Sequence, residues 1–151
     1  MVDKEGIKVF FSYSRKDGVL RDQLAAHLTA LKWRGVIQDW NDHQIEEGTD
    51  WSGAIAPYID TSDIILLLLS PDFLASEHSR KEANRVLKRH ESGQARVLPV
   101  LLRPIDYAET PFSTLPATPR NGIPITRWPN KDEALLSVAK DIHQAAEACL
   151  A

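Results

Sequence analysis

The stretch DIILLLLS, from Asp63 to Ser70, places six consecutive large apolar residues between two polar ones. A strand with one solvated face alternates apolar and polar side chains, whereas a strand covered on both faces is apolar throughout. Six residues are far too few to cross a bilayer, which takes about 20. The stretch therefore predicts a central strand of a parallel sheet that helices cover on both sides.

Further short apolar runs on either side of this stretch predict the rest of the sheet. The predicted strands are Ile7–Phe11, Val36–Trp40, Asp63–Ser70, Arg96–Leu102 and a short edge strand at Ile123–Ile125. Between them, apolar residues recur every three or four positions, which is typical of amphipathic helices. This alternation predicts a doubly wound, flavodoxin-like α/β fold, with a mostly parallel five-stranded sheet and helices on both faces.

Three helices are predicted between these strands and a fourth after the last of them. They are predicted from Leu20 to Leu31 with an end near Gly35, at Trp51–Ile59, at Phe73–His90 with a stop at Ser92-Gly93, and after a cap at Asp132. In the last helix the residues expected to be buried are Leu135, Leu136, Val138, Ala139, Ile142 and Ala146.

The composition limits the class of protein. The chain has 151 residues, of which 43% are hydrophobic, and 18 Lys+Arg against 21 Asp+Glu give a formal charge of −3. These values predict one globular domain over residues 1–151, with a core at about 7–148, and they argue against nucleic acid or a membrane as a partner. The single cysteine, Cys149, excludes an internal disulfide. Because the N-terminus lacks a signal-peptide pattern, a cytoplasmic location is expected.

Ligand sites of doubly wound sheets lie beyond the carboxyl ends of the strands. Here those ends are Ser12–Lys16, Trp40–Asp50 and Ser70–Glu82, and they lack the glycine-rich dinucleotide motif, the phosphate-binding loop and the G-x-S-x-G nucleophile turn. Ser12 and Ser70 also stand where a phospho-receiver domain needs aspartates. The five histidines have no metal-ligand spacing, so no metal site is expected.

The strand ends instead carry a recognisable series of motifs. These are FFSYSRKD at Phe10–Asp17, Asp39-Trp40, IEEG at Ile45–Gly48 with Trp51, and SPDFLAS at Ser70–Ser76 with Glu82 beyond it. In this order and spacing they resemble the sequence boxes of the TIR (Toll/interleukin-1 receptor) domain family, and the resemblance runs from about Ile7 to Ile142. The proline-rich segment from Tyr107 to Trp128 is similar to bacterial members that are fused to sensor modules.

The resemblance implies an NAD⁺ glycohydrolase that uses NAD⁺ as substrate and needs no cofactor. Glu82 matches the glutamate that catalytic members carry on the helix after the third strand, although Ser79-x-x-Glu82 replaces the commoner Cys-x-x-Glu. A lone carboxylate suits this reaction, because nicotinamide is already a cationic leaving group and the oxocarbenium-like ribose needs a negative charge beside it. The alternative is a solvated helix glutamate that pairs with Arg85.

The resemblance also implies the residues that bind NAD⁺. They are Ser12, Tyr13, Ser14, Arg15, Glu46, Asp50, Trp51 and His78. Arg15 and nearby backbone amides suit the pyrophosphate, and His78 stands where catalytic relatives often have a stacking aromatic. The alternatives are an exposed loop arginine, a surface histidine, and a Trp51 that anchors the second helix in the core.

Asn41–Asp50 is predicted to form the polar loop, called the BB loop in TIR domains, that closes the site and touches a neighbouring subunit. Its assembly residues are Gln44, Ile45, Glu46, Glu47 and Gly48. The implied partners are other TIR domains in a head-to-tail oligomer or filament and a fused or associated sensor module, and the implied setting is bacterial immune or antiphage defence. The resemblance leaves open whether the product is ADP-ribose or a cyclic isomer. It also leaves open a non-catalytic adaptor, whereas a ribosyltransferase would need motifs that are missing.

Overall fold

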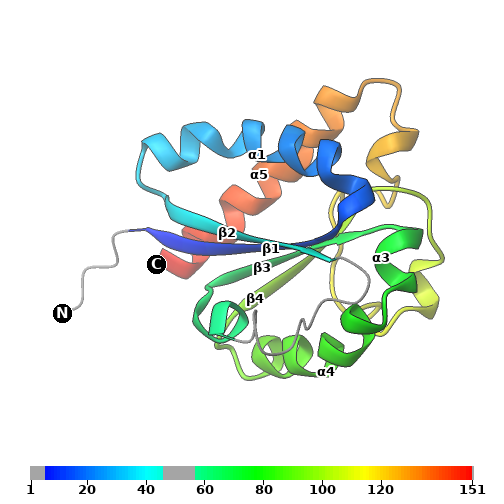
Figure 1. Ribbon diagram of the computed structural model, residues 1–151. Coiled ribbons are helices and arrows are strands. Elements are labelled where there is room, and N and C mark those ends of the chain that lie inside the picture. Colours follow the sequence, from blue (N-terminus) through cyan, green and yellow to red (C-terminus); the bar gives the residue numbers. More distant parts are fainter. Residues whose placement is uncertain (1–5, 46–56, 151) are drawn as a thin grey trace.

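A computed structural model describes residues 6–45 and 57–150, and within them the sheet has four strands, all parallel, in the order β2-β1-β3-β4 (Figure 1). The strands are β1 (Ile7–Ser14), β2 (Ile37–Ile45), β3 (Ile64–Leu69) and β4 (Arg96–Leu101). The chain runs from β1 to β2 on one side and then crosses to β3 and β4 on the other. The direction of winding therefore changes between β1 and β3, which is where doubly wound sheets bind ligands.

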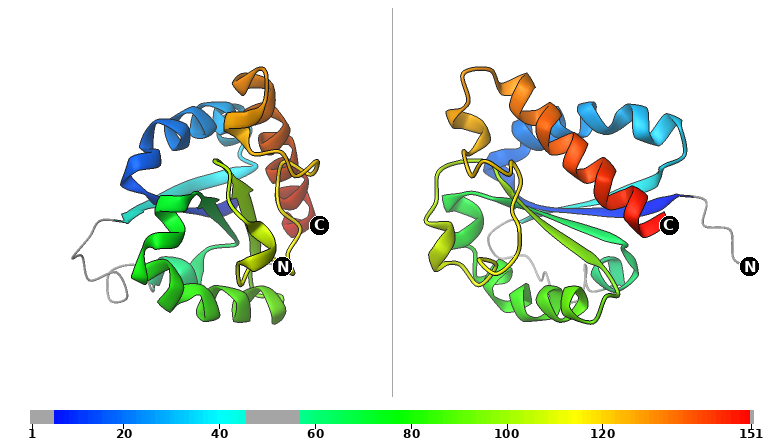
Figure 2. Two further views of the ribbon diagram at one scale, coloured as in Figure 1. Left: turned by 90° about the vertical axis from the view of Figure 1, so that its right-hand side faces the viewer. Right: turned by 180° about the vertical axis from the view of Figure 1, so that it is seen from behind.

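Helices cover both faces of the sheet, as predicted. The helices α1 (Gly18–Trp33) and α5 (Lys131–Leu150) lie on one face, and α3 (Pro71–Ala75) and α4 (Glu77–Glu91) lie on the other (Figures 1 and 2). Among the described residues, three single turns of 3-10 helix connect these elements: η1 (Arg15–Asp17), η2 (Tyr107–Glu109) and η3 (Ile125–Arg127). Residues 57–61 are also helical, and the earlier part of the helix predicted from Trp51 lies outside the described residues.

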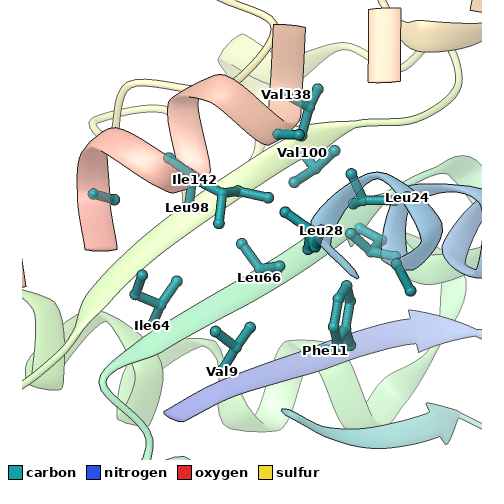
Figure 3. Close-up of a cluster of buried hydrophobic side chains, with 14 of the residues drawn as sticks. Val9, Phe11, Leu24, Leu28, Ile64, Leu66, Leu98, Val100, Val138 and Ile142 are labelled. Atoms are coloured by element: carbon teal, nitrogen blue, oxygen red, sulfur yellow. The ribbon is translucent and has the colours of Figure 1, made fainter. Parts of the chain in front are cut away.

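The sheet separates two hydrophobic cores. Side chains of β1, β3 and β4 such as Phe11 and Leu66 meet Leu28 of α1 and Ile142 of α5 (Figure 3). On the opposite face Phe10 packs in a second core with residues of α3 and α4. Since successive strand residues point to opposite faces, Ser12 and Ser14 lie on the α4 side of β1.

The prediction for the central strand is confirmed. All six residues of β3 are buried, and the strand pairs with β1 on one side and β4 on the other. Burial of each such side chain stabilises the fold by roughly 1.5–3 kcal/mol, so β3 anchors both cores.

The predicted edge strand at Ile123–Ile125 is wrong. Ile125 begins η3, Pro124 has no N–H for a sheet ladder, and Gly122 adopts a positive φ of 77°. Beside β4 there is instead one isolated parallel bridge, between Val100 and Thr118. The sheet of the described residues therefore has four strands rather than five.

The first two strands are longer than predicted. β1 continues to Ser14, and β2 continues to Ile45 in parallel register with it, so that Tyr13 pairs with Gln44 and Ser14 with Ile45. Asn41–Ile45 is therefore strand and not loop. The pattern of apolar residues does not predict this extension, because most of its residues are polar. The extension forms through backbone pairing with β1, which does not depend on apolar side chains.

The helix predicted over Phe73–His90 is two helices. Ser70 caps α3 by accepting a hydrogen bond from Phe73 N–H at 3.1 Å, and Ser76 is extended, with φ −75° and ψ 130°, which separates α3 from α4. The predicted stop is confirmed, because Gly93 has a positive φ of 74° after α4 ends.

Two details of the last helix are also wrong. Asn130 rather than Asp132 provides the cap, since its Oδ1 accepts from Glu133 N–H at 3.1 Å. Leu136 is 45% exposed, because it lies beside the buried stripe and not on it. The other five predicted core residues of this helix are buried.

Candidate functional site

The carboxyl ends of β1 and β3 meet at one edge of the sheet, at the change in winding direction. β1 passes directly into η1, and β3 passes through Ser70 into α3. The chain after β4 joins them, because the N–H groups of Leu102 and Arg103 donate to the carbonyl of Leu69 at 3.1 and 3.4 Å. Three separate segments therefore supply side chains to this edge.

Ser14 shapes the turn that follows β1. Its Oγ accepts a hydrogen bond from Lys16 N–H at 3.3 Å and so caps η1, and Gly18 N–H donates to the carbonyl of Arg15 at the other end of the turn. Arg15 and Lys16 are exposed on this turn, whereas Asp17 is buried. The turn thus presents two cations outward and one carboxylate inward.

A hydrogen-bond network joins the three segments through Asp17, Ser70, Asp72 and Arg103, and we call it the Asp17–Arg103 network. Ser70 Oγ donates to Asp17 Oδ2 at 2.5 Å, and Arg103 Nε donates to Asp17 Oδ1 at 2.9 Å. A second nitrogen of Arg103, Nη2, donates to Asp72 in the first turn of α3. The side chain of Asp17 is 2% exposed, so both of its oxygens are satisfied within the protein.

The charges of this network stabilise one another. The hydrogen bond from Arg103 holds the pKa of Asp72 below its usual value despite the opposing effect of desolvation, and Lys16 Nζ lies 3.5 Å from Asp72 Oδ1. Burial lowers the pKa of Arg103, but its bonds to Asp72 and Asp17 more than offset this effect and raise the pKa above its ordinary value. Asp72 and Arg103 therefore remain ionised at neutral pH.

Ser12, two residues before the end of β1, has a hydroxyl with no hydrogen-bond partner among the described residues. The residue is 2% exposed and lies on the α4 side of β1. Buried polar atoms are nearly always hydrogen-bonded, so the Ser12 hydroxyl retains its capacity for a hydrogen bond near the carboxyl end of β1.

The structure brings some of the predicted binding residues together. Ser12 and Ser14 lie on the α4 face of the sheet, and Arg15 lies on the exposed turn beyond them. Tyr13 has its ring in the core on the α1 side, where the guanidinium of Arg21 lies 6.0 Å from the ring centroid. Tyr13 is therefore on the opposite face of the sheet from Ser12 and Ser14.

Of the remaining predicted residues, two lie on α4, two lie on β2, and the others lie outside the described residues. His78 and Glu82 belong to α4, which packs on the same face of the sheet as Ser12. Gln44 and Ile45, predicted in the loop, are the last two residues of β2. The other predicted loop and binding residues, Glu46, Glu47, Gly48, Asp50 and Trp51, lie outside the described residues.

Sequence reasoning missed the Asp17–Arg103 network. Asp17 is the last residue of the motif FFSYSRKD, but nothing in the sequence links it to Arg103, which is 86 residues away. A signal was present at Arg103 itself, since a charged residue directly after a buried strand and before Pro104 lies at the carboxyl edge of the sheet.

The sheet of the described residues is all parallel, with the order β2-β1-β3-β4, and a polar network lies where the winding changes direction. These features define a doubly wound α/β protein of the flavodoxin-like type. Comparison with known families is more specific. Residues 9–138 match the model of the TIR domain, and the chain therefore belongs to the TIR domain family. The resemblance noted in the sequence is confirmed.

Individual relatives were also found. The chain is 51% identical over 139 residues to "Uncharacterized protein y4lF" of Sinorhizobium fredii, and the match covers 91% of this chain and 43% of the relative. The chain thus spans less than half the length of that relative. It is also similar to a solved structure described as "Structure of the activated Roq1 resistosome directly recognizing the pathogen effector XopQ (TIR domains)", with 17% identity, a TM-score of 0.49, and coverage of 96% of this chain and 82% of that one.

Within residues 6–45 and 57–150, none of the helices is both long and apolar enough to cross a membrane. In the same part of the chain, no group of three or more His, Cys, Asp or Glu side chains is arranged to hold a metal ion.

Proposed function

We propose that this TIR domain cleaves NAD⁺ between nicotinamide and ribose at the carboxyl edge of its sheet. One observation carries the proposal. The helix that contains Glu82, α4, packs on the face of the sheet where Ser12 and Ser14 end β1. The winding changes direction between β1 and β3, and the carboxyl ends of these two strands are where a doubly wound sheet binds a nucleotide.

Glu82 is the proposed catalytic residue. As the bond to nicotinamide lengthens, positive charge develops on the ribose, and a fixed carboxylate beside it lowers the barrier. Nicotinamide leaves as a neutral base because its ring nitrogen takes back the bonding electrons, so no general acid is needed. Water or a second nucleophile then captures the ribose cation.

The proposed binding residues follow from the shape of the edge. Arg15, an exposed residue on the turn η1 that follows β1, suits the pyrophosphate because a guanidinium can donate two parallel hydrogen bonds to it. Ser12 offers a hydroxyl that has no partner within the described residues. Glu46, Asp50, Trp51 and His78 complete the proposed set, together with Tyr13, which reaches this edge through its backbone because its ring lies in the core on the α1 side.

We also propose that self-assembly controls this reaction. Gln44 and Ile45 pair with Tyr13 and Ser14 at the end of β1, so the segment Gln44–Gly48 begins at the rim of the proposed site. A head-to-tail contact at this rim is heterologous and generates open filaments. A sensor module that gathers several copies would then switch the enzyme on, which suits a role in bacterial immune or antiphage defence.

Incubation of the purified chain at high concentration with NAD⁺ tests the proposed function. Chromatography should show free nicotinamide together with ADP-ribose or a cyclic isomer in equal amount. A chain that assembles with itself and releases no nicotinamide would be an adaptor that acts through TIR–TIR contacts, and the proposal would then be wrong.

A further inference from the structure

Asp17 stands at the N-terminal boundary of α1, where an aspartate normally caps the helix. Its side chain makes no hydrogen bond to α1. It instead turns inward and is almost fully buried against Ser70 and Arg103. The residue therefore gives up a common local role for contacts with two distant segments.

Arg103 holds two carboxylates from different segments. Its Nε binds Asp17 of η1 and its Nη2 binds Asp72 of α3. The planar guanidinium fixes the directions of these two bonds relative to each other. Arg103 therefore sets how η1, which follows β1, lies against α3, which follows β3.

Both held segments lead to residues of the proposed site. Arg15 is two positions before Asp17 on the same short turn, and α3 is followed after Ser76 by α4, which contains Glu82. Ser70 reinforces the connection because one hydroxyl both donates to Asp17 and accepts from Phe73 N–H. A displacement of Asp17 therefore moves Arg15 relative to α4.

We propose that Arg103 is a positioning residue that acts on NAD⁺ binding through Arg15, and this inference rests on the proposed function for its reaction. Without Arg103, the Asp17 carboxylate is buried with one hydroxyl partner, a costly state that is relieved by moving toward water. That movement carries Arg15 away from the pyrophosphate. Since pyrophosphate is bound equally in ground and transition states, KM rises while kcat changes little.

Steady-state kinetics of the full chain in an Arg15→Ala and Arg103→Ala double-mutant cycle tests the coupling. Each single variant is expected to raise KM for NAD⁺ by about 10-fold with kcat within about 3-fold of wild type. The double variant should be no worse than Arg15→Ala alone, because both changes remove the same contact. Arg103→Lys keeps the charge without the fork and should give an intermediate KM.

Arg120→Ala is the matched control, since Arg120 also pairs with a carboxylate, that of Asp141 on α5 at 3.2 Å. Its KM should equal that of wild type. A wild-type KM in Arg103→Ala, or losses that multiply in the double variant, would overturn the proposal.

Hydrogen exchange separates this inference from the proposed function. In Arg103→Ala the amides of Lys16 and Gly18, which close η1, should exchange about 10-fold faster, whereas Arg120→Ala should leave them unchanged. If wild type releases no nicotinamide, the proposed function fails, and the exchange at η1 still decides whether Arg103 positions this turn. Unchanged exchange in Arg103→Ala would reject the positioning role whatever the activity.

Discussion

Asp17 joins three segments of the chain at the carboxyl edge of the sheet, because its carboxylate in η1 bonds Ser70 and Arg103. It is a charged group with a side chain that is 2% exposed, and it is tolerated because Arg103 and Ser70 together bond both of its oxygens. The same chain contains a contrasting pair, Asp60 with Arg85, in which both side chains are more than 40% exposed. The two pairs therefore separate the effect of burial from that of charge.

Asp17→Asn is expected to destabilise the protein by about 1–3 kcal/mol, because Arg103 loses its buried partner and an amide cannot accept at both positions. Asp60→Asn should cost less than about 1 kcal/mol, as exposed ion pairs do. Urea unfolding of both variants measures the difference. Equal losses of unfolding free energy in the two variants would show that the buried contacts of Asp17 contribute no more than an exposed ion pair does.

His90 makes the stability depend on pH. Its Nδ1 accepts a hydrogen bond from Val97 N–H at 3.1 Å, which requires the neutral ring. Burial is the main cause that lowers the pKa of His90 below 6.5, and the nearby charge of Arg96 adds to it. The charge of Glu91 has a smaller, opposite effect. The unfolded chain therefore binds a proton more readily than the folded one. The contribution of His90 is complete above the unfolded value and declines as the pH falls from about 6.5 toward the lower folded value.

The thermal midpoint should accordingly fall between about pH 7.5 and pH 5.5 by more in wild type than in His90→Asn. Asparagine keeps an acceptor near the position of Nδ1 but does not titrate. Calorimetry at several pH values measures both slopes. Identical slopes would remove His90 from the titration of stability.

At the scale of elements, the entry into the sheet depends on Gly6. This residue has φ +109°, and a Cβ there would lie 2.5 Å from the carbonyl oxygen of Gly35 and 2.8 Å from Gln38 N, both of which are backbone atoms. Gly93, at the end of α4, also has a positive φ of 74°, but a Cβ there would meet open space. The two glycines differ in crowding while sharing a conformation that suits glycine.

Gly6→Ala should therefore cost about 3 kcal/mol or more, because strain and collision add. Gly93→Ala should cost about 1 kcal/mol, for strain alone. Denaturant unfolding of the two variants gives the comparison. A loss in Gly6→Ala no larger than that in Gly93→Ala would show that the start of β1 moves easily.

Elements with strong apolar patterns could be predicted from the sequence, and elements held by polar contacts could not. The buried leucines and alanines of β3 and α5 form patterns that predict these two elements. Residues 41–45 of β2 are held by backbone pairing with β1, which no side-chain pattern predicts. The strand predicted at Ile123–Ile125 does not form, because Pro124 cannot donate a hydrogen bond to a sheet, and this outweighs the preference of the two isoleucines for strands. The family motifs predicted which strand ends form the candidate site, and that assignment stays a prediction, but the bond from Arg103 to Asp17 depends on tertiary placement that no local pattern encodes.

At the scale of the whole molecule, the proposed assembly makes activity a property of several copies. If a neighbouring subunit completes the site through Gln44–Gly48, specific activity should rise with concentration or on fusion to an oligomerising partner. Nicotinamide release measured from nanomolar to high-micromolar protein checks this. Replacement of Gly48 by valine should lower both assembly and activity if that position needs a positive φ. Constant specific activity over the whole range would reject a shared site.

The central claim is that one carboxylate on α4 cleaves NAD⁺, and its most direct test is nicotinamide release by Glu82→Gln under conditions in which wild type is active. Glutamine keeps the size of the side chain and removes its charge, so turnover should fall by about 10²–10⁴-fold while the melting temperature is retained. Glu91→Gln, at the exposed end of the same helix, is the control and should keep wild-type turnover. Wild-type nicotinamide release from a folded Glu82→Gln protein would contradict the account.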